Sequence, residues 1–129
     1  MEPWILHIET STKTTSIALS QGDRIAALAE DVAGDHTRVI NDLIRQVLSE
    51  AGLRLDQLQA ISVNEGPGSY TALRIGVVSA KGMAYALDLP LILVPGLRAL
   101  AQLARTEKPG YHYYLPMLDA RRDEVYLGV

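Results

Sequence analysis

One segment, residues 60–87, restricts the fold of this 129-residue chain more than any other. It combines a short apolar run (60–64, AISVN), a loop of glycine and proline (65–69), and a long segment (70–87) with only two charges. The apolar run predicts a buried strand, the loop predicts a tight turn, and the long segment predicts a helix that follows Ser69. A strand followed at once by a helix is the unit of parallel sheets, so we expect an α/β fold.

Patterns on both sides extend this unit. Apolar runs at hairpin spacing predict three antiparallel strands at the start of the chain. Apolar residues at three- and four-residue spacing predict a helix before residue 60, with Asp35 as its N-cap and Gly52 just past its end. The order predicts a mixed sheet with helices on its faces. The expected elements are strands at 4–9, 17–20, 25–32, 60–64 and 91–94, helices at 36–51, 70–87 and 97–105, and two last strands at 113–118 and 124–128.

Composition excludes several classes of function. The chain has no cysteine, which excludes a disulfide scaffold, a thiol nucleophile and a zinc site with sulfur ligands. Its net charge of -3 argues against a broad electrostatic contact with nucleic acid. The N-terminus has neither a basic region nor a long apolar run, so a cytoplasmic protein without a membrane span is expected. His7, His36 and His112 are scattered, which predicts no metal site.

Two segments could bind a phosphate group. A hydroxyl-rich turn follows the first strand, and the glycine-rich loop would expose N–H groups at the start of helix 70–87. Both also have a structural explanation, since Ser and Thr favour turns and glycine lets backbones approach closely. The sequence leaves both explanations open. The candidate phosphate- or nucleotide-binding residues are Thr10, Ser11, Thr12, Gly66, Gly68 and Ser69.

Helix 70–87 also predicts a protein partner. It is apolar on nearly every side and therefore needs cover on two sides, of which the sheet provides one. A second protein could provide the other, because a bare apolar patch of this size is uncommon on a monomer. The alternative is cover from elsewhere in the same protein. Together with helix 36–51, the predicted partner interface comprises Val39, Leu43, Val47, Ala72, Gly76, Ser79, Ala80 and Met83.

Four segments resemble the TsaB (YeaZ) family in order and spacing. They are IETST (8–12), DHTRVI (35–40), the long stretch NEGPGSYTALRIGVVSAKGMAYALDLPLI (64–92), and LDARRDEVY (118–126). The resemblance implies an ASKHA fold of the actin/hexokinase type, with βββαβαβα order. It also implies a first domain at residues 1–108 and the beginning of a second at 109–129. The positions that match further family motifs are His36, Arg74, Asp119, Arg121 and Glu124.

The resemblance further implies a role in making N6-threonylcarbamoyladenosine at position 37 of tRNA. Family members are thought to act as a scaffold, to pair with a catalytic paralogue, TsaD, and to work with the ATPase TsaE. The chain would then reach tRNA only through the complex. The paralogue's His-x-x-x-His metal pair is not matched, since VPGLRALAQ (94–102) stands there. We therefore expect no catalysis by the chain alone and no required cofactor.

Three points stay open. Glu9 stands where Asp is usual in the family, which argues against a strong ATP or ADP site in this chain and leaves a weak or composite nucleotide site as the alternative. The isolated chain could also form a homodimer. The alternative functions are a small-molecule kinase of the same fold and a glycoprotease-like metallopeptidase. The kinase would need a complete second domain and an acidic base, and the peptidase would need metal ligands.

Overall fold

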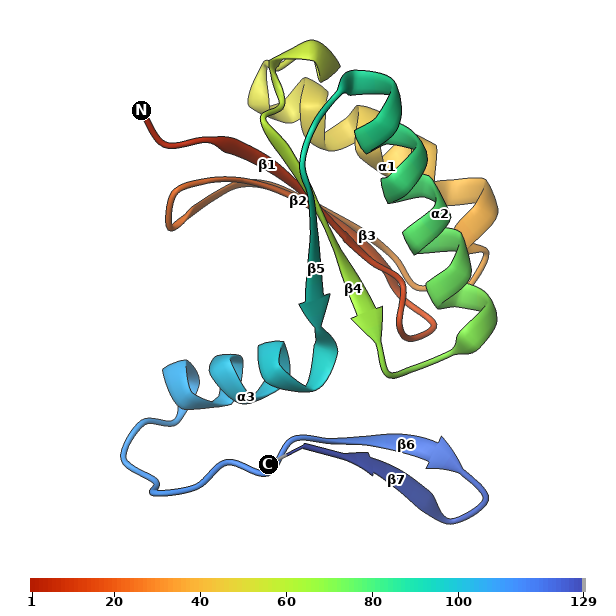
Figure 1. The fold of residues 1–129 in the computed structure, drawn as a ribbon, viewed down its shortest axis with the longest axis vertical. Helices are drawn as coiled ribbons and strands as arrows, with labels where there is room; N and C mark the ends of the chain where they lie inside the picture. The colour runs from red at the N-terminus through yellow and green to blue at the C-terminus, as the bar shows by residue number, and fades with distance from the viewer. Residues whose placement is uncertain (129) are drawn as a thin grey trace.

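The structure is a computed structural model that describes residues 1–128 (Figure 1). No helix within these residues is both long enough and apolar enough to cross a membrane. The elements, in chain order, are β1 (Trp4–Glu9), β2 (Thr15–Gln21), β3 (Arg24–Asp31), α1 (His36–Ala51), the 3₁₀ turn η1 (Leu55–Gln57), β4 (Ala60–Gly66), α2 (Tyr70–Leu87), β5 (Leu91–Pro95), α3 (Gly96–Glu107), β6 (Met117–Arg121) and β7 (Glu124–Leu127).

The first five strands form one mixed sheet in the order β3-β2-β1-β4-β5. β1, β2 and β3 pair antiparallel, whereas β4 is parallel to β1 and β5 is parallel to β4. This confirms the expected α/β fold. The parallel pairing brings the carboxyl ends of β1 and β4 side by side, with Ile8 opposite Val63. Ligands of α/β proteins commonly bind at such an edge, just beyond the strand ends.

The core lies between the sheet and the two helices α1 and α2, which cover the same face (Figure 1). Alternate residues of each strand point to this face, as the two-residue period of a strand requires. Leu6, Ile17 and Ile61 are fully buried there. Helix α1 supplies a stripe at three- and four-residue spacing, which consists of Ile40, Leu43, Ile44, Val47 and Leu48.

Both predicted ends of α1 are confirmed. The Oδ1 atom of Asp35 accepts a hydrogen bond from the N–H of Arg38 at 3.2 Å, as an N-cap should. Gly52 follows the helix in the left-handed region with φ of 67° and donates to the carbonyls of Leu48 and Ser49. Ser69 does precede α2, but its side chain makes no capping hydrogen bond.

The penultimate strand, β6, begins further along the chain than the sequence predicts. Residues 113–118 were expected to form it, whereas β6 begins at Met117. Pro116, which has no N–H for a ladder, stands just before it. The hydroxyl of Tyr114 donates to the carbonyl of Lys108 at 2.6 Å, and this bond ties the segment to the end of α3 instead. β6 and β7 form a separate two-stranded sheet, and α3 and this hairpin lie together beyond one end of the large sheet (Figure 1).

His7 lies on the sheet face opposite α1 and α2, between two serines. Its Nδ1 lies 2.6 Å from the hydroxyl of Ser62, and its Nε2 lies 2.7 Å from the hydroxyl of Ser20. Burial lowers the pKa of His7, because the charged ring would lose its hydration. In the unfolded chain the same ring recovers an ordinary pKa of about 6.5.

We therefore predict that His7 makes the fold acid-sensitive. Because the pKa of His7 is lower in the folded state, the unfolded state binds the proton more readily. The contribution of His7 to the free energy of unfolding is therefore fully present above the unfolded pKa, and it is lost as the pH falls below that value. Urea unfolding between about pH 7.5 and about pH 5 should show a smaller loss of free energy for His7→Gln than for the wild type. Equal losses would contradict this role of His7, since His36 and His112 are present in both proteins.

Candidate functional site

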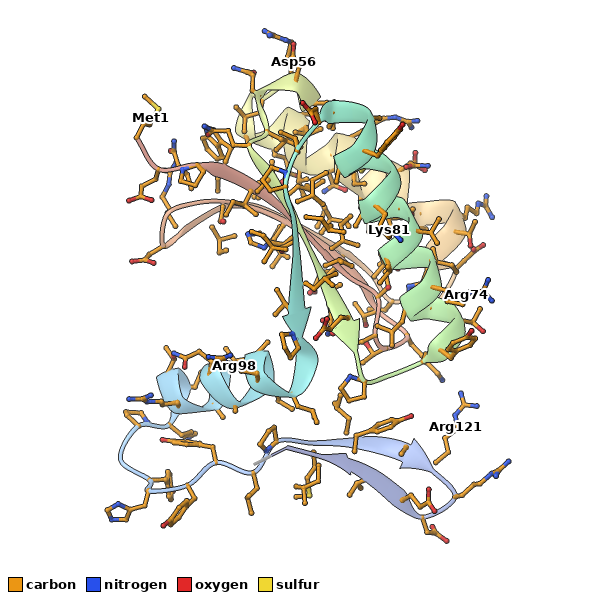
Figure 2. The ribbon with its side chains drawn as sticks, in the orientation of Figure 1. Met1, Asp56, Arg74, Lys81, Arg98 and Arg121 are labelled. Carbon is orange, nitrogen blue, oxygen red and sulfur yellow. The ribbon has the colours of Figure 1, made fainter. Side chains whose placement is uncertain are left out.

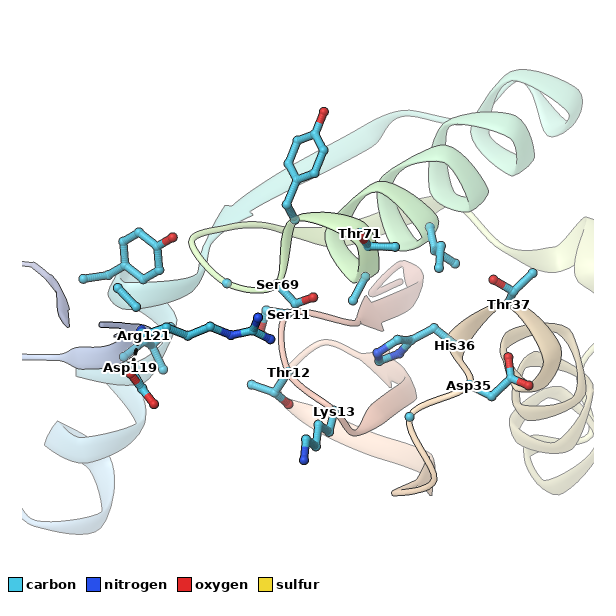
Figure 3. A pocket seen from close by; sticks show the side chains of 18 residues that line it. Ser11, Thr12, Lys13, Asp35, His36, Thr37, Ser69, Thr71, Asp119 and Arg121 are labelled. Atoms are coloured by element: carbon cyan, nitrogen blue, oxygen red, sulfur yellow. Dashed lines mark hydrogen bonds between the residues drawn. The ribbon is translucent and has the colours of Figure 1, made fainter. Parts of the chain in front are cut away.

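A pocket of about 910 Å³ lies where the loops at one edge of the sheet meet the hairpin (Figure 3). Its walls are the β1–β2 turn, the starts of α1 and α2, and part of β6 with Tyr126 of β7. Four of the six candidate phosphate-binding residues line it, namely Ser11, Thr12, Gly68 and Ser69. Thr10 and Gly66 do not line it, and their role as binding residues stays a prediction.

Thr10 and Ser11 fasten the β1–β2 turn to the start of α2. The hydroxyl of Thr10 is buried and donates to the carbonyl of Ala72 at 2.7 Å. The carbonyl of Ser11 accepts a hydrogen bond from the N–H of Ser69 at 2.9 Å, and its own N–H donates to Oε1 of Glu9 at 2.6 Å. These groups are therefore occupied by the fold. The Thr10 hydroxyl in particular has no proton left to donate to a ligand.

The two glycines of the loop serve close packing. A Cβ on Gly68 would overlap the carbonyl of Ser11, and one on Gly66 would lie 3.2 Å from the side chain of Leu73. Both residues also have φ in the positive region that favours glycine, at 113° for Gly66 and 157° for Gly68. The structural explanation for the glycines is thus supported.

Glu9 joins the ends of β1 and β4. Its Oε2 accepts from Nδ2 of Asn64 at 2.5 Å, while Oδ1 of Asn64 accepts from the N–H of Gly66 at 2.8 Å. With Oε1 bonded to Ser11, both oxygens of Glu9 hold the backbone of the site in shape. Within residues 1–128, no group of three His, Asp or Glu side chains is placed to hold a metal ion.

Three of the five residues that match further family motifs line the pocket, and two do not. His36, Asp119 and Arg121 line the pocket, and Lys13, which the sequence reasoning missed, does too. Lys13 is the only charged residue in the hydroxyl-rich turn, which was the available signal. Arg74 and Glu124 do not line the pocket. Arg74 lies over the ring of Tyr70, with its guanidinium carbon 5.6 Å from the ring centre, and Glu124 is exposed on β7.

Comparison with known proteins agrees with this architecture. The sequence model of the TsaD family, described as tRNA N6-adenosine threonylcarbamoyltransferase, matches residues 23–129. The tRNA threonylcarbamoyladenosine biosynthesis protein TsaB of Haemophilus influenzae is 36% identical over 124 residues, which are 96% of this chain and 52% of that protein. The chain belongs to the TsaB branch of this family. TsaB of Escherichia coli is 37% identical over 122 residues, or 95% of this chain and 52% of the relative.

Solved structures extend the agreement to three dimensions. YeaZ from Pseudomonas aeruginosa superposes with a TM-score of 0.88 at 36% identity, covering 98% of this chain and 58% of that one. This similarity confirms the resemblance to the TsaB family and the ASKHA-type fold that it implies. The chain spans about half the length of the curated TsaB relatives that it matches. The division into domains at residue 108 stays a prediction.

The partner interface predicted for this TsaB chain needs correction. Five of its eight residues are buried in the chain's own core and cannot contact another protein while the fold is intact. Val39, Ser79 and Met83 are only partly buried. The small residues on α2 let the helix lie close to the sheet, so they mark the inner face. The buried five are Leu43, Val47, Ala72, Gly76 and Ala80.

Gly76 shows the packing most clearly. A Cβ at this position would overlap the hydroxyl oxygen of Thr10 and lie 3.2–3.3 Å from two of its carbons. Gly82, six residues further along α2, has open space where its Cβ would be. The outer face of α2, on which Gly82 lies, also carries exposed side chains. They are Tyr70, Arg74, Val78, Lys81 and Tyr85.

Proposed function

We propose that the chain is a partner subunit of the cytoplasmic machinery that makes N6-threonylcarbamoyladenosine in tRNA. In this role it pairs with a TsaD-type catalytic subunit, has no catalytic activity alone, and meets tRNA and a TsaE-type ATPase only within the complex. The similarity to TsaB proteins along nearly the whole chain supports the pathway. The observation that carries the pairing is the outer face of α2.

This outer face is unusual for an exposed helix. Val78 is 66% exposed and Tyr85 is 92% exposed, and the two lie seven residues apart, so they share one side of α2. Exposed tyrosine and valine on one stripe, with a glycine between them at 82, let a second helix pack closely. Such a stripe is typical of an interface core rather than of a solvated surface.

Charge limits the kind of partner. Arg74 and Lys81 border the stripe, and α2 carries no acidic residue. Arg74 projects from α2 away from the sheet (Figure 2). A partner helix with acidic residues at the margins of an apolar seam would complement this face. We propose a TsaD-type subunit in this place.

The experiment is sedimentation velocity of the chain with and without the TsaD-type protein of the same organism. We expect one-to-one association at micromolar concentration. A chain that stays alone in the mixture would contradict the proposal. A chain that forms only homodimers, unchanged by the added protein, would equally contradict it.

A further inference from the structure

The loop that joins α3 to β6, residues 108–116, carries three tyrosines within four residues. They are Tyr111, Tyr113 and Tyr114. Tyr111 is 70% exposed and Tyr113 is 86% exposed, so water rather than the core surrounds both rings. Figure 1 shows the loop at the end of the molecule away from α1 and α2. The loop and the outer face of α2 can therefore be occupied at the same time.

The loop is held in one shape by its own residues. The hydroxyl of Tyr114 donates to the carbonyl of Lys108 at 2.6 Å, which ties the two ends of the loop together. The rings of Tyr111 and Tyr114 meet edge to face, with their centres 6.1 Å apart. Tyr114 thus supports the loop, and Tyr111 and Tyr113 are presented to solvent. Rings that are already positioned lose little conformational entropy when a ligand binds them.

The residues around these tyrosines are basic. Residues 96–118 carry three cations and one carboxylate, although the chain as a whole has a net charge of -3. Arg105 lies in the last turn of α3, and Lys108 begins the loop. The ion pairs formed within residues 1–128 lie on other segments, so neither cation is paired in that range. Positive charge beside exposed rings attracts a polyanion to this end of the molecule.

The composition of this segment favours a nucleic acid over a protein as its ligand. Residues 105–114 contain no Leu, Ile, Val or Met, whereas the core of a protein interface is apolar and poor in lysine. Single-stranded nucleic acid fits both features of the loop, because its bases stack on aromatic rings and its phosphates attract cations. In a folded RNA, the unpaired loops and ends are the parts whose bases are free to stack on a protein.

We propose that the α3–β6 loop binds single-stranded RNA. The rings of Tyr111 and Tyr113 stack on bases, and the side chains of Arg105 and Lys108 lie beside the phosphates. Contact with so few bases is weak by itself and needs no broad basic surface, which agrees with the net charge of the chain. The inference rests on the proposed function in one respect, namely that an unpaired region of tRNA is the RNA that the loop meets within the complex.

The test is the fluorescence anisotropy of a labelled oligouridylate that is titrated with the whole chain at low salt. Tyr113 is the residue to change, because its ring is the more exposed of the two. Tyr113→Leu removes the ring and keeps an apolar side chain, whereas Tyr113→Phe keeps the ring and removes only the hydroxyl. The two variants therefore form a matched pair, and circular dichroism checks that both are folded.

We expect saturable binding with a dissociation constant below about 1 mM. Tyr113→Leu should weaken it about tenfold, the usual effect of losing one stacked base, and Tyr113→Phe by less than about twofold. An RNA duplex, whose bases are already paired, should bind at least about tenfold more weakly than the single strand. The proposal would be overturned by a lack of saturation, by equal effects of the two substitutions, or by equal binding of the duplex.

Lys108→Ala tests the contact with phosphate. Loss of one cation–phosphate contact with a single strand should reduce the slope of log K against log salt concentration by about 0.7. Arg24→Ala is the control, because Arg24 is also exposed but lies at the start of β3 in the large sheet. An unchanged slope for Lys108→Ala, or the same change for Arg24→Ala, would contradict the phosphate contact. These measurements need neither TsaD nor tRNA, so their outcome is independent of the test of the proposed function.

Discussion

Gly76→Val is expected to lower the free energy of unfolding by about 3 kcal/mol or more, which is a large fraction of the total stability of about 5–15 kcal/mol that is typical of a domain. The valine would enter the space occupied by Thr10, and overpacking of this kind costs about 1–3 kcal/mol. It would also break the buried hydrogen bond from Thr10 to Ala72, which contributes about 1 kcal/mol more. Urea denaturation followed by circular dichroism measures the loss.

Gly82→Ala is the matched control for this prediction. It lies on the same helix, and its new Cβ meets nothing within 4 Å. Alanine favours helix over glycine, so the variant should be as stable as the wild type or more stable by up to about 1 kcal/mol. A Gly76→Val protein with wild-type stability would mean that this face of α2 does not pack against β1.

Val78→Glu is expected to weaken association with the TsaD-type subunit by about 100-fold or more and to leave the fold intact. Val78 is 66% exposed in the isolated chain, so the substitution disturbs no core contact. In the complex, however, the carboxylate would lose its hydration inside an apolar seam, a cost that pairing with Arg74 or Lys81 at the border of the stripe would only partly offset. Sedimentation or calorimetry with the paralogue measures the change in affinity.

Leu28→Glu is the control for the interface. Leu28 is also exposed and apolar, but it lies on the sheet face opposite α1 and α2, since its neighbours Ala27 and Ala29 point into the core. This variant should bind the paralogue as the wild type does. Equal weakening by both substitutions would indicate a general effect of charge, and undiminished binding by Val78→Glu would exclude the outer face of α2.

The elements that the sequence predicted well are those with a local signal. Helix α1 has an apolar stripe within its sixteen residues and a cap residue immediately on each side, Asp35 and Gly52, so its bounds, His36 and Ala51, could be predicted. The strands β1 and β4 are short apolar runs ended by turn residues, and they too lie where expected. Strand β6 was placed too early because Pro116 and the hydrogen bond from Tyr114 to Lys108 keep the preceding segment out of the ladder, and the apolar pattern reveals neither effect.

The side of α2 that packs against the sheet could not be predicted, because its small residues have two possible explanations. Small residues at helical spacing allow close approach of any backbone, whether of the chain's own sheet or of another protein. Thr10 decides between them, since its hydroxyl fills the space beside Gly76, and it lies 66 residues earlier in the sequence. The same holds for the pocket, in which Lys13, His36 and Arg121 meet from three distant segments.

The content of N6-threonylcarbamoyladenosine in tRNA tests the central claim most directly. Total tRNA would be digested to nucleosides and measured by mass spectrometry in the organism that produces the protein, with the gene encoding Val78→Glu, encoding Leu28→Glu, or removed. We predict that the modified nucleoside falls to a small fraction of its normal amount in the Val78→Glu cells and on removal, and that it is normal in the Leu28→Glu cells. An unchanged content after removal of the gene would contradict the proposed function.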